Sequence, residues 1–482
     1  MYQKPSPQPA KRSPLRVLRI VLAGLFFAGL TWLFVDSTGL AARYLGWMAK
    51  MQFLPAILSV VGCFSALSLV FVLLTVIVTL LFGRVYCSVV CPLGIMQDLF
   101  TRFGGQKWLK KIWRHLGHSR WHYQKGHTVL RYSILGVFVV LLFTLHPLAS
   151  MIEPYSLFGR IVHSLSRSQE EGNILLISSL LFFVGISVWA LIDGRGWCNN
   201  VCPVGSILGL LSKYSLFRPT IDADKCTGCR ACERKCKAKC IDVSTHSVDT
   251  SRCVDCFDCL DKCQFGALSF RRNSSLKMER ENVSADRRRF LTMTGALAVT
   301  GIASAQHKTD GGLAVIEQKQ VPPRTLPVKP AGSVSLRHFQ QHCTACQLCV
   351  TACPEHILRP STDLQTLLQP ELHFELGYCL TGCTRCADIC PTGAIQPIEK
   401  EEKTAIQIGH AVWIAENCVV NTDNVSCGNC ARHCPTGAVT MVGGLPAINT
   451  ELCIGCGHCE YVCPSRPLSA IYVEGHQQQR RI

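Results

Sequence analysis

The sequence lacks the motifs that most often place a haem or a nucleotide in a protein. It contains no Cys-x2-Cys-His, which argues against a covalently attached c-type haem. No Gly-x-Gly-x-x-Gly follows a strand-like run, so no site for a nucleotide cofactor is visible. The region near Ser37 has no obvious small-residue cleavage site, which argues against a secretory signal peptide at the N-terminus.

Cysteine is abundant: there are 30 in a chain of 482 residues, which is long enough for two or three domains. Residues 226–236 and 253–263 both read C-x2-C-x2-C-x3-C, the spacing with which bacterial ferredoxins bind [4Fe-4S] clusters. In two-cluster ferredoxins the fourth cysteine of each motif binds the cluster of the other motif. The predicted ligands are Cys226, Cys229, Cys232 and Cys263 for one cluster, and Cys236, Cys253, Cys256 and Cys259 for the other.

Zinc is the main alternative for these residues, because thiolates bind both metals. A four-cysteine zinc site uses two C-x2-C pairs set well apart, whereas each motif here places three cysteines within seven residues, so the spacing favours iron. Two details depart from the ferredoxin pattern. Lys237 and Gln264 stand where proline usually follows the fourth cysteine. Cys240 is an extra thiol that either replaces Cys236 as a ligand or stays unbound.

Four more cysteine quartets follow between residues 341 and 482. Each ends in Cys-Pro, and the second and third have wider gaps than the usual spacing. Disulfides are the natural alternative, but the regular grouping favours four further [4Fe-4S] clusters, whose pairing between motifs the sequence leaves open. The predicted ligands are Cys343, Cys346, Cys349, Cys353, Cys379, Cys383, Cys386, Cys390, Cys418, Cys427, Cys430, Cys434, Cys453, Cys456, Cys459 and Cys463.

Residues 1–220 contain four long apolar runs, at about 20–35, 54–82, 129–148 and 174–192. A helix needs about 20 apolar residues to cross a bilayer, so we predict four transmembrane helices. The net charge of +17 is concentrated before residue 306, where basic residues flank these runs, which indicates membrane topology rather than nucleic-acid binding. The loop from Arg84 to Arg131 is the most basic, so the positive-inside rule places it, the N-terminus and the region after residue 192 in the cytoplasm.

A sequence repeat follows the second and the fourth apolar run. Both copies fit G-R-x-[YW]-C-x-x-V-C-P-[LV]-G, one starting at Gly83 and one at Gly194. The repeat predicts two helical units side by side, with their cysteines converging at one face of the membrane. A reducing cytoplasm disfavours a disulfide there, and we favour a metal or a cluster over two redox-active dithiol pairs. The predicted ligands are Cys87, Cys91, Cys198 and Cys202, whereas Cys63 is predicted to be a packed core residue.

Residues 271–340 are predicted to link the cytoplasmic ferredoxin module of residues 221–270 to the terminal domain of residues 341–482. Within this linker Arg287-Arg288 precedes Phe290-Leu291, a mild apolar stretch and Ala303-Ser304-Ala305. This order is typical of a twin-arginine export signal, with an ordinary basic linker as the alternative, and cleavage after Ala305 stays open. The signal would place the terminal domain in the periplasm.

The first 270 residues resemble NapH, the membrane ferredoxin-type subunit of quinol dehydrogenases, and its MauN relatives. The shared features are the four apolar runs, the two Cys-x3-Cys-Pro motifs and the two-cluster module at 226–263. Residues 286–482 resemble the NapG and NapF polyferredoxins through the twin-arginine start and the long-gap quartet opened by Cys418, although the quartet at Cys379 departs from the usual spacing. The chain thus resembles a fusion of the two types.

The resemblance implies a protein of the bacterial inner membrane that takes electrons from the membrane quinol pool. Six [4Fe-4S] clusters, or seven if the Cys-x3-Cys-Pro pairs bind one, would pass them to a periplasmic cytochrome or terminal reductase. The implied fold is an α-helical membrane bundle of four transmembrane helices plus small α+β ferredoxin-like iron–sulfur domains. The alternative is an assembly or reactivation factor that supplies electrons while a periplasmic metalloenzyme matures, as the MauN and MauM relatives suggest.

Two questions follow from this interpretation. Quinol oxidation releases protons, and the predicted periplasmic loop with its flanks offers His146, Glu153, Tyr155 and His163. Glu153 is the best single candidate for a base, but a solvated loop carboxylate is the simpler interpretation, so no catalytic residue is assigned. In addition, roughly 30 Å of hydrocarbon would separate the two cytoplasmic clusters from the four periplasmic ones. Either the quinone itself bridges this distance, or the Cys-x3-Cys-Pro site lies deep enough to help, or the two ends serve different partners.

Overall fold

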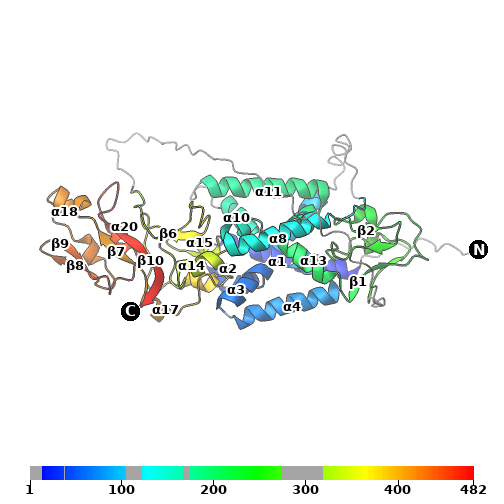
Figure 1. Ribbon diagram of the computed structural model, residues 1–482, viewed down its shortest axis with the longest axis horizontal. Coiled ribbons are helices and arrows are strands. Elements are labelled where there is room, and N and C mark those ends of the chain that lie inside the picture. The colour runs from blue at the N-terminus through cyan, green and yellow to red at the C-terminus, as the bar shows by residue number, and fades with distance from the viewer. Residues whose placement is uncertain (1–12, 37, 64, 105–121, 167–172, 273–318) are drawn as a thin grey trace, which may run out of the picture.

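The computed structural model describes residues 13–36, 38–63, 65–104, 122–166, 173–272 and 319–482. The predicted twin-arginine segment at 286–305 lies outside these residues. The first part of the chain is helical and packs around one apolar core (Figure 1). Its longest helices are α1 (Pro14–Val35) and α11 (Asn173–Asp193). The others are α2 (Leu40–Lys50), α3 (Phe53–Cys63), α4 (Ala66–Phe82), α5 (Tyr86–Val89), α6 (Pro92–Phe103), α8 (Thr128–Thr144), α9 (His146–Ser150), α10 (Pro154–Ser166), α12 (Gly196–Asn200) and α13 (Pro203–Ser212).

Among the described residues, two helices are long and apolar enough to cross a membrane, Pro14–Val35 and Leu175–Asp193. A third candidate is the pair Leu40–Lys50 and Phe53–Val61, which is bent by 83°. The apolar run predicted as one helix over 54–82 is divided, because Ser65 begins a new helix by accepting a hydrogen bond from the Ser68 N–H. With 17 residues each, α4 and α8 are shorter than a full span, so four transmembrane helices are not confirmed.

The sequence repeat is also a structural repeat. In the first copy α4 leads through Gly83 into α5, and Cys91 is the N-cap of α6. In the second copy α11 leads through Gly194 into α12, and Cys202 is the N-cap of α13. The proline after each N-cap cysteine stands at the start of its helix, where its missing N–H removes no hydrogen bond. Both cysteines therefore lie at a helix start, where backbone N–H groups have no intrahelical partner.

The central module follows directly on α13. Strand β1 (Phe217–Ile221) pairs antiparallel with β4 (Leu268–Arg272), so the first and last segments of the module lie together. The short strands β2 (Ile241–Asp242) and β3 (Ser247–Val248) form a second antiparallel pair. One-turn helices η1 (Glu233–Lys235) and η2 (Leu260–Lys262) each lie between the third and fourth cysteine of a motif. This is the small α+β arrangement expected for a two-cluster ferredoxin.

The terminal domain consists of two such modules joined by one long sheet. The first contains α14 (Leu336–His342), α15 (Leu348–Ala352), β5 (Leu358–Pro360), β6 (Pro370–Leu372) and α16 (Arg385–Ile389). The second contains η3 (Ala415–Asn417), α18 (Val419–Thr422), α19 (Asn429–Arg432), β8 (Val439–Val442), β9 (Leu445–Ile448) and α20 (His458–Val462). After α17 (Lys400–Lys403), strand β7 (Ile406–Trp413) pairs antiparallel with β10 (Ile471–Arg481), which ties the last residues of the chain back to the junction between the modules.

Residues 319–340, assigned to a linker from the sequence, pack against the terminal domain. Val328 and Ala331 are buried in its core. The Arg324 guanidinium pairs with Glu460 at 2.6 Å, and the Leu326 carbonyl accepts a hydrogen bond from the Gly475 N–H at 3.2 Å. The terminal domain therefore begins earlier than residue 341.

Figure 1 shows the helical domain between the central module and the terminal domain. Helix α1 contacts both. At its start Arg16 pairs with Asp258 of the central module at 2.7 Å. At its end the Phe34 carbonyl accepts a hydrogen bond from the Thr351 hydroxyl of the terminal domain at 3.4 Å. The iron–sulfur modules thus lie at opposite ends of the helices.

Gly194 is required where the central module meets the helical domain. Its φ of +66° is strained for other residues, and a Cβ there would lie 2.5 Å from the Lys237 carbonyl. We expect Gly194→Ala to lower the free energy of unfolding by at least about 1–2 kcal/mol, the cost of a left-handed residue alone. The measurement is thermal loss of cluster absorbance in the purified protein. Gly136→Ala in α8, where nothing lies within 4 Å of the added Cβ, is the control and should not destabilise the protein.

Candidate iron–sulfur sites

The central module gathers its thiols into the two predicted sets. Burial, together with the charges of Cys263 and Cys229, raises the pKa of Cys232 to about 11. Cys263 belongs to the second motif, so its position beside Cys232 fits the predicted cross-ligation. The pKa of Cys259 is likewise raised by burial and then by the charges of its neighbours. Those neighbours are Cys256, Cys253, Cys236 and, from the other set, Cys232.

Cys240 lies at the second of these sites. Its Sγ is 3.4 Å from the Sγ of Cys236, and Cys253 is also a neighbour. Both Cys236 and Cys240 are buried. The sequence left open whether Cys240 replaces Cys236 as a ligand. In the structure both thiols lie at this site, so the position of each is compatible with that role.

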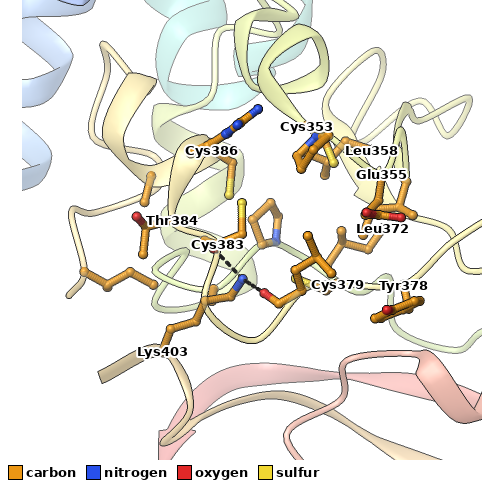
Figure 2. Close-up of a pocket in the computed structure, with 18 residues that line it drawn as sticks. Cys353, Glu355, Leu358, Leu372, Tyr378, Cys379, Cys383, Thr384, Cys386 and Lys403 are labelled. Atoms are coloured by element: carbon orange, nitrogen blue, oxygen red, sulfur yellow. Dashed lines mark hydrogen bonds between the residues drawn. The ribbon is translucent and has the colours of Figure 1, made fainter. Parts of the chain in front are cut away.

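In the first terminal module each quartet surrounds its own cavity. Figure 2 shows the cavity lined by Cys379, Cys383 and Cys386 of the second motif together with Cys353 of the first. The other cavity is lined by Cys343, Cys346 and Cys349 of the first motif together with Cys390 of the second. Each cavity is thus lined by three cysteines of one motif and the fourth cysteine of the other, an arrangement that the sequence left open.

The second terminal module repeats this arrangement. The pKa of Cys456 is raised to about 12 by burial and then by the charges of other cysteines, among them Cys453 and Cys434. The pKa of Cys430 is raised by burial and by the charges of Cys427 and Cys463. The two quartets are therefore Cys434, Cys453, Cys456 and Cys459, and Cys418, Cys427, Cys430 and Cys463.

The loops that hold the regular quartets share one backbone conformation. The residues on both sides of the second cysteine have positive φ in all four C-x2-C-x2-C motifs. These pairs are Gly228 and Arg230, Asp255 and Phe257, Ala345 and Gln347, and Gly455 and Gly457. Successive residues of this kind turn backbone N–H groups towards a common centre, which suits an anionic cluster. Backbone N–H groups of Ala411 and Ala470 donate to the Sγ of Cys453 and Cys463, each at 3.3 Å.

The donor sets fit a cubane better than the alternatives. Each quartet is made of free thiols, and no disulfide joins the cysteines that the structure describes. In tetrahedral zinc sites with Zn–S bonds of about 2.3 Å, the sulfurs lie about 3.8 Å apart. Over the described ranges, no group of three or more Cys, His, Asp or Glu side chains is gathered tightly enough for one metal ion. A cubane, in which four irons separate the ligands, accommodates wider spacing.

The repeat brings its four cysteines together inside the helical domain. All four are buried, and the charge of Cys198 acts on both Cys91 and Cys202. Two arginines complete the site with approximate twofold symmetry. Arg84 donates to the Cys198 carbonyl at 3.3 Å and its Nη2 lies 3.9 Å from the Cys87 Sγ. Arg195 donates to the Cys87 carbonyl at 2.9 Å and its Nη1 lies 3.9 Å from the Cys198 Sγ.

The four polar residues singled out near the predicted periplasmic loop are buried, not solvated. Their exposed fractions are 6% for His146, 1% for Glu153, 1% for Tyr155 and 0% for His163. The interpretation of Glu153 as a solvated loop carboxylate is therefore wrong. The terminal domain covers this region, and the Thr351 hydroxyl lies 2.7 Å from the His163 Nδ1. Such burial arises from a tertiary contact that loop composition does not show.

Glu153 begins α10. Its carboxylate accepts hydrogen bonds from the Tyr155 N–H, at 3.1 Å, and from the Ser156 N–H. Burial raises the pKa of Glu153 above its ordinary value, while the Ser156 hydrogen bonds, the Tyr155 N–H and the charge of Arg160 oppose the rise. Glu153 is also within electrostatic range of Cys346, a ligand candidate of the terminal domain.

Lys403 places a positive charge beside the quartet of Figure 2. It is buried, and its ammonium group donates to the carbonyls of Leu380 and Cys383. A positive charge stabilises the reduced, more negative form of a cluster. We expect Lys403→Met to lower the reduction potential of one terminal cluster and leave the others unchanged in an EPR-monitored redox titration. Lys400→Met, an exposed lysine in the same helix, is the control and should shift no potential.

Family comparisons agree with these sites. A 4Fe-4S binding domain family matches residues 64–114 and 175–222, the two copies of the repeat. A 4Fe-4S dicluster domain family matches residues 342–394, 378–438 and 425–467 in the terminal domain. No solved structure is detectably similar to the chain.

Individual relatives give the same result. The ferredoxin-type protein MauN of methylamine utilization, from Methylobacillus flagellatus, is 33% identical over 39% of this chain and 62% of its own length. The ferredoxin-type protein NapH of Escherichia coli is 31% identical over 38% of this chain and 55% of its own length. The ferredoxin-type protein NapF of the same organism is 29% identical over 31% of this chain and 87% of its own length. The chain thus spans about 60% of MauN and about half of NapH.

The fold and the thiol quartets define a membrane-associated iron–sulfur protein of electron transfer. Within that class the chain is similar to the ferredoxin-type proteins NapH and MauN, as its cysteine motifs indicated.

Proposed function

We propose that the chain oxidises quinol where its helices meet the terminal domain and passes the electrons to an acceptor protein in the periplasm. Each quinol would lose two electrons and two protons and become quinone, and the oxidised acceptor, a cytochrome or metal-containing reductase, would be reduced. Bound [4Fe-4S] clusters supply the one-electron chemistry that no side chain here provides. The chain's own residues position the thiol sites relative to one another, bind the quinol head group and take up the protons that quinol releases.

One observation supports this function above all. The buried polar residues of 146–163 lie directly against the loop that begins at Cys343. Burial, together with the neighbouring charge of His342, lowers the pKa of His146 to about 4. Tyr155 and Glu153 are both within electrostatic range of Cys346. Polar groups that suit a quinol hydroxyl therefore adjoin the thiol quartet nearest to the helices.

The terminal quartets continue in one row from that point. Cys349 of the first quartet and Cys386 of the second pack against the same group of buried apolar residues. The Cys379 N–H donates to the Cys456 carbonyl at 2.8 Å, which joins the second quartet to the group that contains Cys434, Cys453, Cys456 and Cys459. The remaining group, which contains Cys418, Cys427, Cys430 and Cys463, lies beside α18 at the end farthest from the helices (Figure 1). Its Cys427 and Cys430 are partly exposed. This end suits contact with an acceptor.

Reduction by quinol tests the function directly. Reduced menaquinol and ubiquinol analogues are added anaerobically to the oxidised, full-length protein while cluster absorbance is followed. We expect the absorbance to bleach, and dithionite to bleach it in the same sample. If dithionite bleaches the clusters and neither analogue does, quinol oxidation is contradicted.

Glu153 is proposed as the proton acceptor at this site. A positioned base contributes about 100-fold or more, so we expect Glu153→Gln to slow bleaching by a quinol analogue roughly 100-fold. Reduction by dithionite should keep its wild-type rate, because dithionite needs no base. Glu153→Asp retains a carboxylate and should recover part of the quinol rate. Equal rates in Glu153→Gln and wild type would remove Glu153 from the mechanism.

Electron supply to a maturing periplasmic metalloenzyme is the second candidate function. The similarity to MauN, a protein of methylamine utilization, favours it. It predicts clusters that donate to an unfinished metalloenzyme but that quinol analogues do not reduce. The bleaching experiment therefore separates the two functions.

A further inference from the structure

We propose that the central module carries a docking surface for a small, acidic one-electron carrier protein of the ferredoxin or flavodoxin type. This surface, called the basic face below, surrounds Cys229 and is formed by the exposed side chains of Lys225, Arg230, Arg234, Lys235 and Lys262. The inference rests on cluster binding by the central module but not on quinol as the electron donor. It adds a second site of electron exchange to the proposed function.

The exposure of Cys229 is the first observation. Cys229 is exposed, whereas the other predicted cluster ligands that the structure describes are buried or partly buried. The other thiols of its quartet, Cys226, Cys232 and Cys263, are all partly exposed as well. A cluster held by this quartet is therefore the one most accessible to an external protein.

The charge around this quartet is the second observation. Within residues 221–236 and 253–264, five basic side chains are exposed, and Asp224 is the one exposed acidic residue. Arg230 directly follows Cys229 in the chain, and the Arg234 guanidinium donates to the Cys229 carbonyl at 3.0 Å. Lys235 is within electrostatic range of Lys262 of the other motif. Both motifs therefore contribute to one positive region.

Most acidic residues of the same loops are buried in contacts with the rest of the chain. Asp258 and Asp261 pair with Arg16 of α1 at 2.7 and 2.6 Å. The Glu233 carboxylate accepts a hydrogen bond from the N–H of Tyr123, which precedes α8, at 2.9 Å. All three acidic side chains are at most 7% exposed. Negative charge is thus used within the chain, and the outward surface of the module is left basic.

A basic surface around a site of electron exchange favours an acidic partner. Complementary charge speeds the encounter of two proteins and orients them, more than it raises their affinity. Redox proteins bind one another weakly through small interfaces, which a compact charged face suits. Anionic lipid head groups also attract basic side chains, but they cannot exchange electrons with a cluster. The exposed thiol at the centre of the basic face therefore favours a redox protein.

The two ends of the molecule differ in charge. The central module lies at the opposite end from α18, beside which the acceptor is proposed to bind (Figure 1). Residues 306–482 contain 13 Lys and Arg against 15 Asp and Glu, whereas the loops of the outer quartet expose mainly basic side chains. One partner would not be attracted equally to both ends, so each end suits a partner of its own.

The exchange is a balanced one-electron transfer. The reduced carrier loses one electron, and the oxidised cluster of the outer quartet gains it. No bond forms or breaks in the protein, and no proton needs to move. Transfer in the opposite direction would use the same face.

Reduction by flavodoxin, an acidic flavin protein, tests the basic face. Flavodoxin hydroquinone is mixed anaerobically with the oxidised, full-length protein, and formation of the blue flavin semiquinone is followed by stopped flow. We expect the second-order rate constant to fall steeply between about 0.01 M and about 1 M salt, over which the Debye length falls from about 30 Å to about 3 Å. Lys235→Glu/Lys262→Glu should lower the low-salt rate constant about 10-fold or more and remove most of its salt dependence.

Binding of oxidised flavodoxin gives a measurement that needs no electron transfer. Isothermal titration calorimetry at low salt should show weaker binding by Lys235→Glu/Lys262→Glu than by wild type. Lys235→Gln/Lys262→Gln removes the two charges without reversing them and should show smaller losses of the same sign. Asp224→Asn removes the exposed acidic residue and should make reduction faster than in wild type, a gain that misfolding does not produce.

Arg271→Glu/Arg272→Glu is the matched control. It also reverses two exposed positive charges of the central module. Arg272 lies opposite Phe217 in the β1–β4 pair, and the Phe217 ring stacks on Phe82 of α4, so this position adjoins the helical domain. The control should keep most of the flavodoxin rate and its salt dependence. Bleaching by a quinol analogue should be the same in all these variants.

The possible outcomes separate the inference from the proposed function. Equal rate constants and equal affinities in Lys235→Glu/Lys262→Glu and wild type would overturn the inference. If that variant keeps the wild-type flavodoxin rate but loses a preference for phosphatidylglycerol over phosphatidylcholine bilayers, the basic face binds lipid and the inference is likewise overturned. Salt-dependent reduction by flavodoxin without reduction by any quinol analogue would support the inference and contradict the proposed function.

Discussion

Cys390→Ser is expected to abolish reduction, by a quinol analogue, of the three terminal clusters that lie beyond the one nearest the helices. Cys390 lines the cavity of the first terminal quartet, although it belongs to the second motif in the sequence. The substitution should therefore remove the cluster nearest the helices and leave the one at Cys379, Cys383 and Cys386 in place. The remaining terminal clusters would then be separated from the quinol. Stopped-flow absorbance with a quinol analogue, followed by dithionite, measures both effects.

Cys353→Ser is the matched control. Cys353 lines the cavity of the second quartet, so its substitution should leave the first terminal cluster reducible by quinol and remove the next one. EPR of the quinol-reduced samples identifies which signal survives. If Cys390→Ser instead removes the cluster at Cys379, Cys383 and Cys386, the four ligands come from one motif and the pairing seen in the structure is contradicted.

Asp98→Asn is expected to produce the largest loss of stability. Asp98 is 5% exposed and pairs with Arg195 at 2.8 Å, with Lys237 at 3.5 Å and with Arg19. It thereby joins α1, the second copy of the repeat and the central module. Removing one partner of a buried ion pair costs about 3–5 kcal/mol. Thermal unfolding of the detergent-solubilised protein, followed by cluster absorbance, measures the loss.

The pH dependence of this network has a defined sign. Burial raises the pKa of Asp98, but the charges of Arg195, Lys237 and Arg19 hold it far below its ordinary value. A carboxylate with a lowered pKa stabilises the folded protein above the ordinary pKa, and this stabilisation is lost as the pH falls below it. The effect of Asp98→Asn should therefore be full at neutral pH and shrink in acid. Asp222→Asn, which breaks an exposed pair with Lys225, should not change stability measurably.

The ligand loops could be predicted from the sequence because their information is local. Three cysteines within seven residues can bind three of the four irons of a cubane whatever the rest of the chain does. The pairing of the terminal motifs could not be predicted, because it depends on which loops the strands bring together. The positions of Cys390 and Cys353 follow from the packing of α15 against α16, which no spacing encodes.

The apolar runs did not predict where the helices begin and end. The run at 54–82 is continuous in hydropathy, yet Ser65 caps a new helix within it. Serine at a helix start is a local signal, but apolar residues on both sides conceal it. The burial of Glu153 could not be predicted either, because a polar loop and a loop covered by another domain have the same composition. In this protein, contacts between distant segments create the candidate quinol site.

Iron, acid-labile sulfide and zinc analysis of the anaerobically purified full-length chain, with EPR of the reduced protein, tests the central claim most directly. The account predicts four iron and four sulfide for every thiol quartet, negligible zinc, and interacting signals from neighbouring reduced clusters. Zinc in place of iron, or cystines in place of sulfide-bearing sites, would contradict it.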